Sequence, residues 1–400
     1  MTKLEQLIQD LCPNGVKMVK LGDVGEFYSG LSGKTKEDFK DGNAKFITYK
    51  NIYANMALEL EVDDKVYVAE GEKQNTVQYG DVLFTGSSET PDECGMSSVL
   101  TTQTDENLYL NSFCFGWRLY DKSLYLPDFL KHLFRCSAIR KEIGKTASGV
   151  TRFNVSKKKM AELQIPLPPL AVQSEIVRLL DKFTLYKSEL AAELAARCKQ
   201  YEHYRNQLLT FDENTKRVKL GEVAFYPTER ISITKVENYV GVENLLKDKK
   251  GVEISDKTPK MDAAIKFLPD DILIGNIRPY LRKIWIADRN GGTNGDVVTI
   301  RIKSENINVL NSKFLYHILA SEAFFIYDNQ NAKGAKMPRG DKNAILQYPI
   351  PLPPLEVQER IVAILDRFDA LCNDIKIGLP AEIELRQKQY EHYRDKLLTF

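Results

Sequence analysis

The stretch IPLPPLAVQSEIVRLLDKF at residues 165–183 returns as IPLPPLEVQERIVAILDRF at residues 350–368, with thirteen of nineteen positions identical. A second stretch, QYEHYRNQLLTF at residues 200–211, returns as QYEHYRDKLLTF at residues 389–400, with ten of twelve positions identical. Each pair belongs to a near-constant segment of about fifty residues that follows a longer, divergent one. A period this long excludes a solenoid and indicates a chain of two related units.

The near-constant segment predicts an extended lead-in followed by a long amphipathic helix. Pro166, Pro168 and Pro169 exclude a helix at its start. Beyond them, apolar residues recur at spacings of three and four, which places them on one helical face. These seam residues are Ile176, Leu180, Phe183, Leu190, Leu194 and Tyr201 in the first copy, and Ile361, Leu365, Phe368 and Tyr390 in the second.

A helix of about 38 residues would be roughly 57 Å long, and its apolar face must be buried against a partner. The other copy can supply that partner in a pseudo-symmetric pair. The alternative is that each helix packs only on its own domain. In the second copy, Gly378 and Pro380 predict a break in the helix.

The divergent segments, residues 17–160 and 216–349, have the pattern of α/β domains. Strands are predicted at residues 45–49, 81–85, 112–117, 271–275 and 297–301, and helices at 126–134 and 312–319. The order of these elements matches between the halves although the residues do not. A shared architecture with different surface residues suggests that the two domains bind two different targets.

A basic stretch ends each divergent segment: KEIGKTASGVTRFNVSKKK at 141–159 and KGAKMPRGDK at 333–342. We interpret both as loops whose glycines let the backbone approach a phosphate; ordinary solvated loops are the alternative. A weaker candidate follows a predicted strand at 278–283. The DNA-binding candidates are Lys145, Ser148, Thr151, Arg152, Asn154, Lys157, Arg278, Tyr280, Lys333, Lys336 and Arg339.

Recognisable catalytic patterns are missing from the sequence. SGKT at 32–35 lacks the first glycine of a phosphate-binding loop, and the Pro-Pro pairs lie in LPPL rather than in a DNA amino-methyltransferase motif. Six scattered cysteines without a C-x-x-C pair predict reduced thiols, no metal site and a cytoplasmic protein. The sequence contains no run of eighteen apolar residues, so it predicts no membrane-spanning helix.

The charge balance limits how nucleic acid could be bound. Lysine and arginine number 20 against 20 acids over residues 17–160, and 22 against 16 over 216–349. Neither half is a polycation, so any contact with nucleic acid must come from local clusters.

The doubled PLPPLxVQ and QYEHYRxxLLTF motifs, together with LCPNGV at 11–16, resemble the specificity subunit of type I restriction–modification systems. The resemblance covers the whole chain. It implies an α/β (α+β) fold with two target recognition domains separated by two long antiparallel coiled-coil helices, in a pseudo-two-fold internal repeat. The recognition domains would be residues 1–164 and 212–349, and the helical spacers would be 165–211 and 350–400.

The resemblance also implies a function without chemistry in this chain. Each domain would read one half of a split double-stranded DNA target, and the helices would set the spacing and dock two modification subunits. Those modification subunits would carry S-adenosylmethionine and methylate adenine, whereas this chain would hold no cofactor. Separate restriction (motor) subunits would cleave unmethylated DNA. A self-contained DNA-modifying enzyme and a structural adaptor without DNA binding remain the alternatives.

Overall fold

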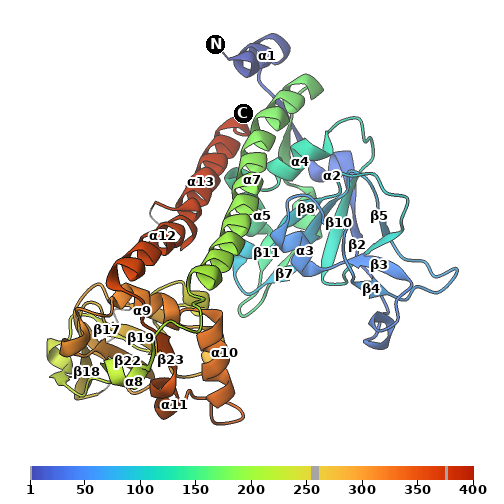
Figure 1. Cartoon of the computed structure of the whole chain (residues 1–400). Helices are drawn as coiled ribbons and strands as arrows, with labels where there is room; N and C mark the ends of the chain where they lie inside the picture. Colours follow the sequence, from blue (N-terminus) through green and yellow to red (C-terminus); the bar gives the residue numbers. More distant parts are fainter. Residues whose placement is uncertain (1, 254–260, 374–376) are drawn as a thin grey trace. The chain divides into compact units, whose positions relative to one another are not determined.

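The computed structural model describes residues 2–253, 261–373 and 377–400 and divides into two compact units. The first unit comprises Met1–Glu189 with Glu384–Phe400, and the second comprises Leu190–Ile383. Each unit therefore combines one divergent segment with helical parts from both near-constant segments (Figure 1). Among the described residues, no helix is both long and apolar enough to cross a membrane.

The first unit is built on two four-stranded sheets. Its elements are α1 (Lys3–Leu11), β1 (Lys17–Lys20), α2 (Leu21–Val24), β2 (Gly25–Ser29), η1 (Glu37–Phe39), β3 (Ala44–Ile47), α3 (Tyr49–Ala54), β4 (Lys65–Val66), β5 (Thr76–Val77), β6 (Val82–Thr85), β7 (Ser87–Ser88), η2 (Pro91–Glu93), β8 (Ser97–Val99), β9 (Leu108–Leu110), β10 (Cys114–Leu119), α4 (Pro127–Leu133), α5 (Ser137–Thr146), β11 (Ala147–Ser148), β12 (Phe153–Val155), α6 (Lys157–Ala161) and β13 (Gln164–Leu167). One sheet, β2-β10-β6-β8, is antiparallel. The other, β4-β3-β9-β5, contains one parallel pair, β3 with β9.

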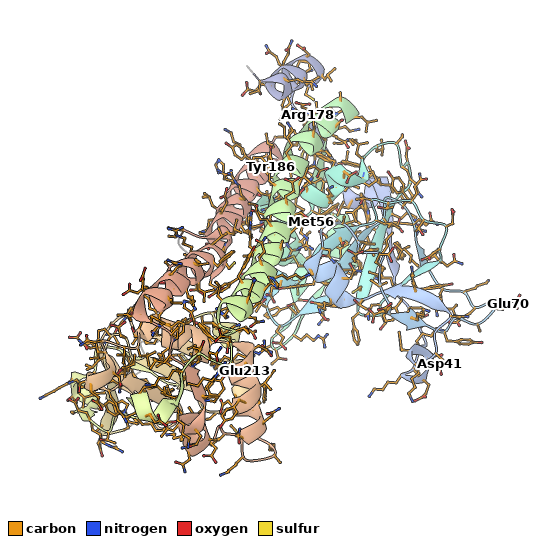
Figure 2. All side chains as sticks on the ribbon, viewed as in Figure 1. Asp41, Met56, Glu70, Arg178, Tyr186 and Glu213 are labelled. Carbon is orange, nitrogen blue, oxygen red and sulfur yellow. The ribbon has the colours of Figure 1, made fainter. Side chains whose placement is uncertain are left out.

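The core of the first unit forms where the antiparallel sheet meets α4. All four residues of β6 are buried, which explains its continuous apolar run. The Phe134 ring packs edge-on to Phe84 at 5.3 Å and to Trp117 at 5.8 Å between centroids. The loops that carry Asp41 and Glu70 lie at the edge of this unit away from α7 (Figure 2).

The second unit repeats this construction. Its elements are β14 (Arg217–Lys219), α8 (Leu220–Val223), β15 (Ala224–Phe225), β16 (Arg230–Ser232), η3 (Ile233–Lys235), β17 (Tyr239–Val240), η4 (Lys247–Lys249), β18 (Ala263–Phe267), β19 (Ile272–Gly275), η5 (Pro279–Leu281), β20 (Ile284–Ile286), β21 (Gly291–Thr293), β22 (Val297–Ile302), η6 (Ser304–Asn306), α9 (Ser312–Leu319), α10 (Glu322–Asn331), α11 (Lys342–Gln347) and β23 (Pro349–Pro351). An antiparallel sheet, β15-β22-β19-β20, again accompanies a sheet with one parallel pair, β16-β18-β21-β17. Every strand and helix predicted in the divergent segments is present in one of the two units.

The near-constant segments form α7 (Leu170–Leu208), α12 (Leu355–Asn373) and α13 (Leu379–Leu397). The prolines before α7 and α12 lie in β13 and β23, which pair with β1 and β14. The predicted break in the second copy is confirmed: α12 ends at Asn373, and Pro380 lies in the first turn of α13. The 39 residues of α7 are continuous and cross from one unit into the other.

Within each unit, the two helical copies run antiparallel. In the first unit, Phe183 stacks on Tyr393 at 5.2 Å, and Lys187 Nζ donates to Gln387 Oε1 at 2.8 Å. As the number rises on one helix, it falls on the other. In the second unit, Tyr201 donates to Asp369 Oδ1 at 3.2 Å and Tyr204 stacks on Phe368 at 5.5 Å, so the order is again reversed.

The seam residues serve the domain cores as well as the helix pair. Ile176, Leu180 and Tyr390 are buried in the same cluster as the α4 side chains of the first unit. Ile361, Leu365 and Tyr201 are buried with the α9 side chains of the second unit. Leu190 and Leu194 are only half-buried. The two explanations offered for the apolar face, the other copy and its own domain, therefore both apply.

Candidate nucleic-acid interface

A small three-stranded sheet presents the first candidate stretch. The hairpin of β11 and β12 pairs Ala147 with Val155, and β12 pairs with β7 through Phe153 and Ser88. Gly149 makes the turn with a φ of +153°, and a Cβ there would collide with the Arg152 carbonyl oxygen. This tight turn places Ser148, Thr151, Arg152 and Asn154 on an exposed hairpin.

The prediction that residues 141–159 form one basic loop is wrong, because helices occupy both ends. Lys145 lies on α5, where the buried Ile143 fixes the helix face, and its Nζ lies 2.6 Å from Glu142 Oε1. Ser156 caps α6 by accepting from the Lys159 backbone, so Lys157 begins a helix. Only residues 149–152 form an irregular turn.

Lys157 has a largely structural setting. Its ammonium group donates to Ser29 Oγ at 2.6 Å and lies 5.6 Å from the centre of the Phe115 ring. Burial lowers the pKa of this lysine. The amine is therefore partly withdrawn from a phosphate that approaches the hairpin, whereas Lys158 and Lys159 are exposed.

Arg152 is the best-oriented cation on this hairpin. Its Nε donates to Ser87 Oγ at 3.0 Å, and its guanidinium carbon lies 5.7 Å from the centre of the Phe113 ring. Thr151, Arg152 and Phe113 border a hollow of about 580 Å³. Tyr53, which lines the same hollow, donates to Glu93 Oε1 at 2.8 Å, and hydrogen bonds from Tyr53 and then from Thr90 and Ser88 lower the pKa of Glu93.

The second candidate stretch has the same construction. Lys333 and Arg339 exchange two backbone hydrogen bonds of 2.8 Å, and Arg339 also bridges to Ile277. Arg278 donates its backbone N–H to the Pro338 carbonyl at 2.7 Å. The fold thus brings the weaker candidate, 278–283, beside the stronger one. The predicted loop 333–342 is too long at its end: Asp341 caps α11, so Lys342 is the first residue of a helix.

The second hairpin carries more charge than the first, and part of it is neutralised. Arg339 Nη1 lies 3.0 Å from Asp296 Oδ1, and Lys333 pairs with Asp341. Arg278 is exposed and has a left-handed backbone with φ of 54°, while Tyr280 is 52% exposed. Lys336 is exposed at the tip.

Backbone hydrogen bonds show that the two surfaces correspond. Val155 donates to the Gly86 carbonyl at 2.9 Å, and Gly340 donates to the Asn276 carbonyl at 3.1 Å. Gly86 and Asn276 each follow a buried strand, β6 or β19, and a proline opens η2 or η5 shortly after. Sequence reasoning found residues 278–283 and missed their counterparts 88–93, although the spacing of the repeat could have located them.

In each unit, an arginine pairs with a buried aspartate at the start of the strand that leads to the candidate surface. Arg118 donates from Nε and Nη2 to both oxygens of Asp81, at 2.9 and 2.6 Å. Arg301 makes the same two bonds to Asp271, at 2.8 and 2.6 Å. Asp81 and Asp271 immediately precede β6 and β19, whose far ends carry the hairpin-paired residues. Bidentate geometry fixes the strand positions rigidly.

In the parts of the chain that the structure describes, no group of three or more histidine, cysteine or carboxylate side chains could hold a metal ion. His132 and His317 are buried, and each bonds one carboxylate, Asp181 or Asp366, at 2.8 and 2.9 Å. Both carboxylates belong to the long helices, so these pairs attach a domain helix to the near-constant segment.

The family's sequence model, described as the type I restriction modification DNA specificity domain, matches residues 13–200 and again 213–385. The chain belongs to this family. The two matched regions correspond to the two divergent segments with most of their helices, which confirms the resemblance seen in the repeated motifs.

Known family members are similar over much of the chain. The specificity subunit of the type I restriction enzyme EcoR124I/EcoR124II from Escherichia coli is 37% identical over 268 residues, covering 62% of this chain and 64% of that protein. A putative specificity subunit, S.HindORF215P of Haemophilus influenzae, is 33% identical over 281 residues, covering 63% and 68%. The match thus spans less than two thirds of the E. coli relative.

A solved structure shares the fold. The S subunit of a type I restriction–modification system from M. genitalium has a TM-score of 0.51 to this chain at 14% identity, with 97% of each chain covered. At this identity the likeness supports the architecture and not the sequence that is read.

Proposed function

We propose that this chain is the DNA-recognition subunit of a type I restriction–modification enzyme and binds a split double-stranded DNA target in the cytoplasm. Its recognition domains are residues 1–164 and 212–349, and each binds one half-site. The observation that carries the proposal is the doubled surface: in each unit, a hairpin that carries an exposed arginine is joined to the segment after a buried strand.

The surfaces suit DNA for physical reasons. Exposed arginine and lysine side chains neutralise phosphates, and an arginine held by a neighbour can present its donors to a guanine edge. We assign DNA contact to the hairpin residues Ser148, Thr151, Arg152 and Asn154 and to Arg278, Tyr280, Lys333, Lys336 and Arg339. Lys145 and Lys157 contribute mainly to the local field, because they lie on α5 and α6, the helices that flank the first hairpin.

The near-constant segments, 165–211 and 350–400, set the spacing between half-sites and dock two modification subunits. The continuous 39-residue α7 supports this, being about 58 Å long at 1.5 Å per residue. The modification subunits would hold S-adenosylmethionine and transfer its methyl group, and restriction subunits would cleave. This chain is non-catalytic and determines the DNA sequence on which the other subunits act.

Adenine methylation mapped across a host genome tests the proposal. The modification subunit of the same system is expressed with and without this chain, and the methylated sequences are compared. A split motif that depends on this chain is the expected result. An unchanged map with both proteins present would contradict recognition, and methylation by this chain alone would show an enzyme instead.

The spacer role needs a separate test. Leu190→Glu with Leu194→Glu places two charges on half-buried positions of α7 that lie outside the centre of either core. We expect loss of methylation at the split motif while both units remain folded. Unchanged methylation would show that these positions of α7 do not set the spacing.

A further inference from the structure

An exposed aromatic ring stands beside the best-oriented arginine of the first unit. Phe113 precedes β10 and is 62% exposed. It belongs to none of the hydrophobic clusters formed by the described residues. Exposure alone would not mark this ring, but Phe113 also borders the hollow that Thr151 and Arg152 line, so its face is available to a ligand that Arg152 contacts.

Arg152 is held so that one end of its guanidinium remains available. Ser87, which is buried, accepts from Nε at 3.0 Å and fixes the direction of the side chain. The ring of Phe113 lies 5.7 Å from the guanidinium carbon and restrains it from the side. Because Nε is engaged, the two terminal nitrogens form the fork that can face a base edge.

Both groups match base features of the DNA major groove. Arginine donates to O6 and N7 of guanine, and an apolar ring contacts the C5-methyl group of thymine. Neighbouring base pairs are stacked about 3.4 Å apart, so two groups separated by 5.7 Å can address adjacent base pairs.

We propose that Phe113 and Arg152 together read two adjacent base pairs of the first half-site, Phe113 contacting a thymine methyl group and Arg152 contacting a guanine. This assignment rests on the proposed function. It adds Phe113, which sequence reasoning did not find, as a specificity-determining residue, and Ser87 as the residue that positions Arg152.

The second unit offers an internal contrast. The hairpin arginine there, Arg339, meets Asp296 at 3.0 Å instead of an aromatic ring. A carboxylate offers no favourable apolar contact to a thymine methyl group. The second half-site should therefore show no methyl dependence through this position.

The test uses the assembly of the full chain with its modification subunits and duplexes bearing the split motif obtained from methylation mapping. Each thymine of the first half-site is replaced in turn by deoxyuridine, which lacks only the methyl group. We expect one replacement to weaken binding by the wild-type assembly about fourfold, the worth of one buried methyl-sized group. The Phe113→Ala assembly should bind the thymine duplex and the matching deoxyuridine duplex with equal affinity.

Arg152→Ala should lose discrimination at the base pair next to that thymine, and 7-deazaguanine at that pair should weaken wild-type binding. Tyr120→Ala is the matched control, because Tyr120 follows β10 at its other end and is 66% exposed. The Tyr120→Ala assembly should retain the full deoxyuridine effect. Phe113 is exposed, so its replacement leaves the core intact.

The outcomes separate this inference from the function on which it rests. Absence of sequence-specific binding by the wild-type assembly would contradict the proposed function itself. Specific binding with no deoxyuridine effect, or an effect equal in wild type and Phe113→Ala, would overturn only the assignment of Phe113. A rise in 2-aminopurine fluorescence that depends on Phe113 would overturn it too, because it would show that Phe113 helps to extrude a base from the stack instead of contacting a methyl group in the groove.

Discussion

Phe113 and Asp296 occupy the same place in the two units. The carbonyl of Phe113 accepts from Gly86 at 2.8 Å, and that of Asp296 accepts from Asn276 at 2.9 Å. Asn111 Oδ1 accepts from the Phe113 backbone at 2.9 Å, as Asn294 Oδ1 does from Asp296 at 3.0 Å. The backbone of this turn is the same in both units. The side chain at this position, Phe113 or Asp296, determines which group contacts the arginine of the hairpin.

Asp296→Asn should alter recognition without unfolding the protein. The Arg339–Asp296 pair is partly exposed, so its loss should change stability by less than about 1 kcal/mol. Removing the charge frees Arg339 from its restraint, and we expect relaxed discrimination at one base pair of the second half-site. Methylation mapping of the variant measures this. A change in the sequence of the first half-site would contradict the assignment of Asp296 to recognition of the second.

Arg152→Ala and Arg339→Ala should each affect one half-site only. A bidentate arginine–guanine contact contributes about 1–3 kcal/mol of discrimination, so each variant should accept substituted bases in its own half-site. Competition binding with duplexes altered in either half supplies the measurement. Equal loss at both half-sites from each variant would argue against two independent readers.

Much of the architecture was predictable because it is periodic. The repeated PLPPL and QYEHYR motifs predicted the two units, and three- and four-residue spacings predicted α7 and the paired helices. Short buried strands such as β6 and β19 were predictable because both faces are covered, so the whole run is apolar.

The candidate surface was predictable only in part. Charge density marked residues 141–159 as a loop, but charge does not distinguish a loop from the solvated face of α5 or α6, whose buried Ile143 and Met160 determine the helices. Ser87, Phe113 and Asp296 were missed because they are distant in sequence from the hairpins. Their role depends on long-range strand pairing, which local patterns do not encode.

Asp81→Ala and Asp271→Ala should destabilise their own units. Each aspartate is almost fully buried and pairs with a bidentate arginine, Arg118 or Arg301, and removing it leaves a largely buried cation without its carboxylate. The expected cost is about 3–5 kcal/mol in unfolding free energy. The chain has two tryptophans, Trp117 in the first unit and Trp285 in the second, so each can report its own unit.

Urea unfolding followed by fluorescence in a Trp285→Phe background reports the first unit, and Asp81→Ala should shift that transition. Asp271→Ala in the same background serves as the control and should leave the Trp117 signal nearly unchanged. Equal shifts from both aspartates would show that the units do not unfold separately.

The buried histidines predict a loss of stability in mild acid. Burial lowers the pKa of His132 below 6.5, outweighing the opposing hydrogen bond to Asp181, with Lys131 lowering it further and Asp128 raising it. The folded protein keeps this imidazole neutral while the unfolded chain takes up a proton. Stability is therefore fully present above pH 6.5 and falls as the pH decreases toward the folded pKa, by at most about 1.4 kcal/mol per pH unit.

His132→Gln should flatten this dependence for the first unit, because glutamine does not titrate. Unfolding followed by Trp117 fluorescence in the Trp285→Phe background between pH 7.5 and about 5 gives the slope, since Asp181, whose pKa lies below 3.8, loses its charge only at lower pH. His317→Gln is the matched control: burial also lowers the pKa of His317, but it lies in the second unit. An unchanged Trp117 slope in His132→Gln would mean that another group takes up the proton.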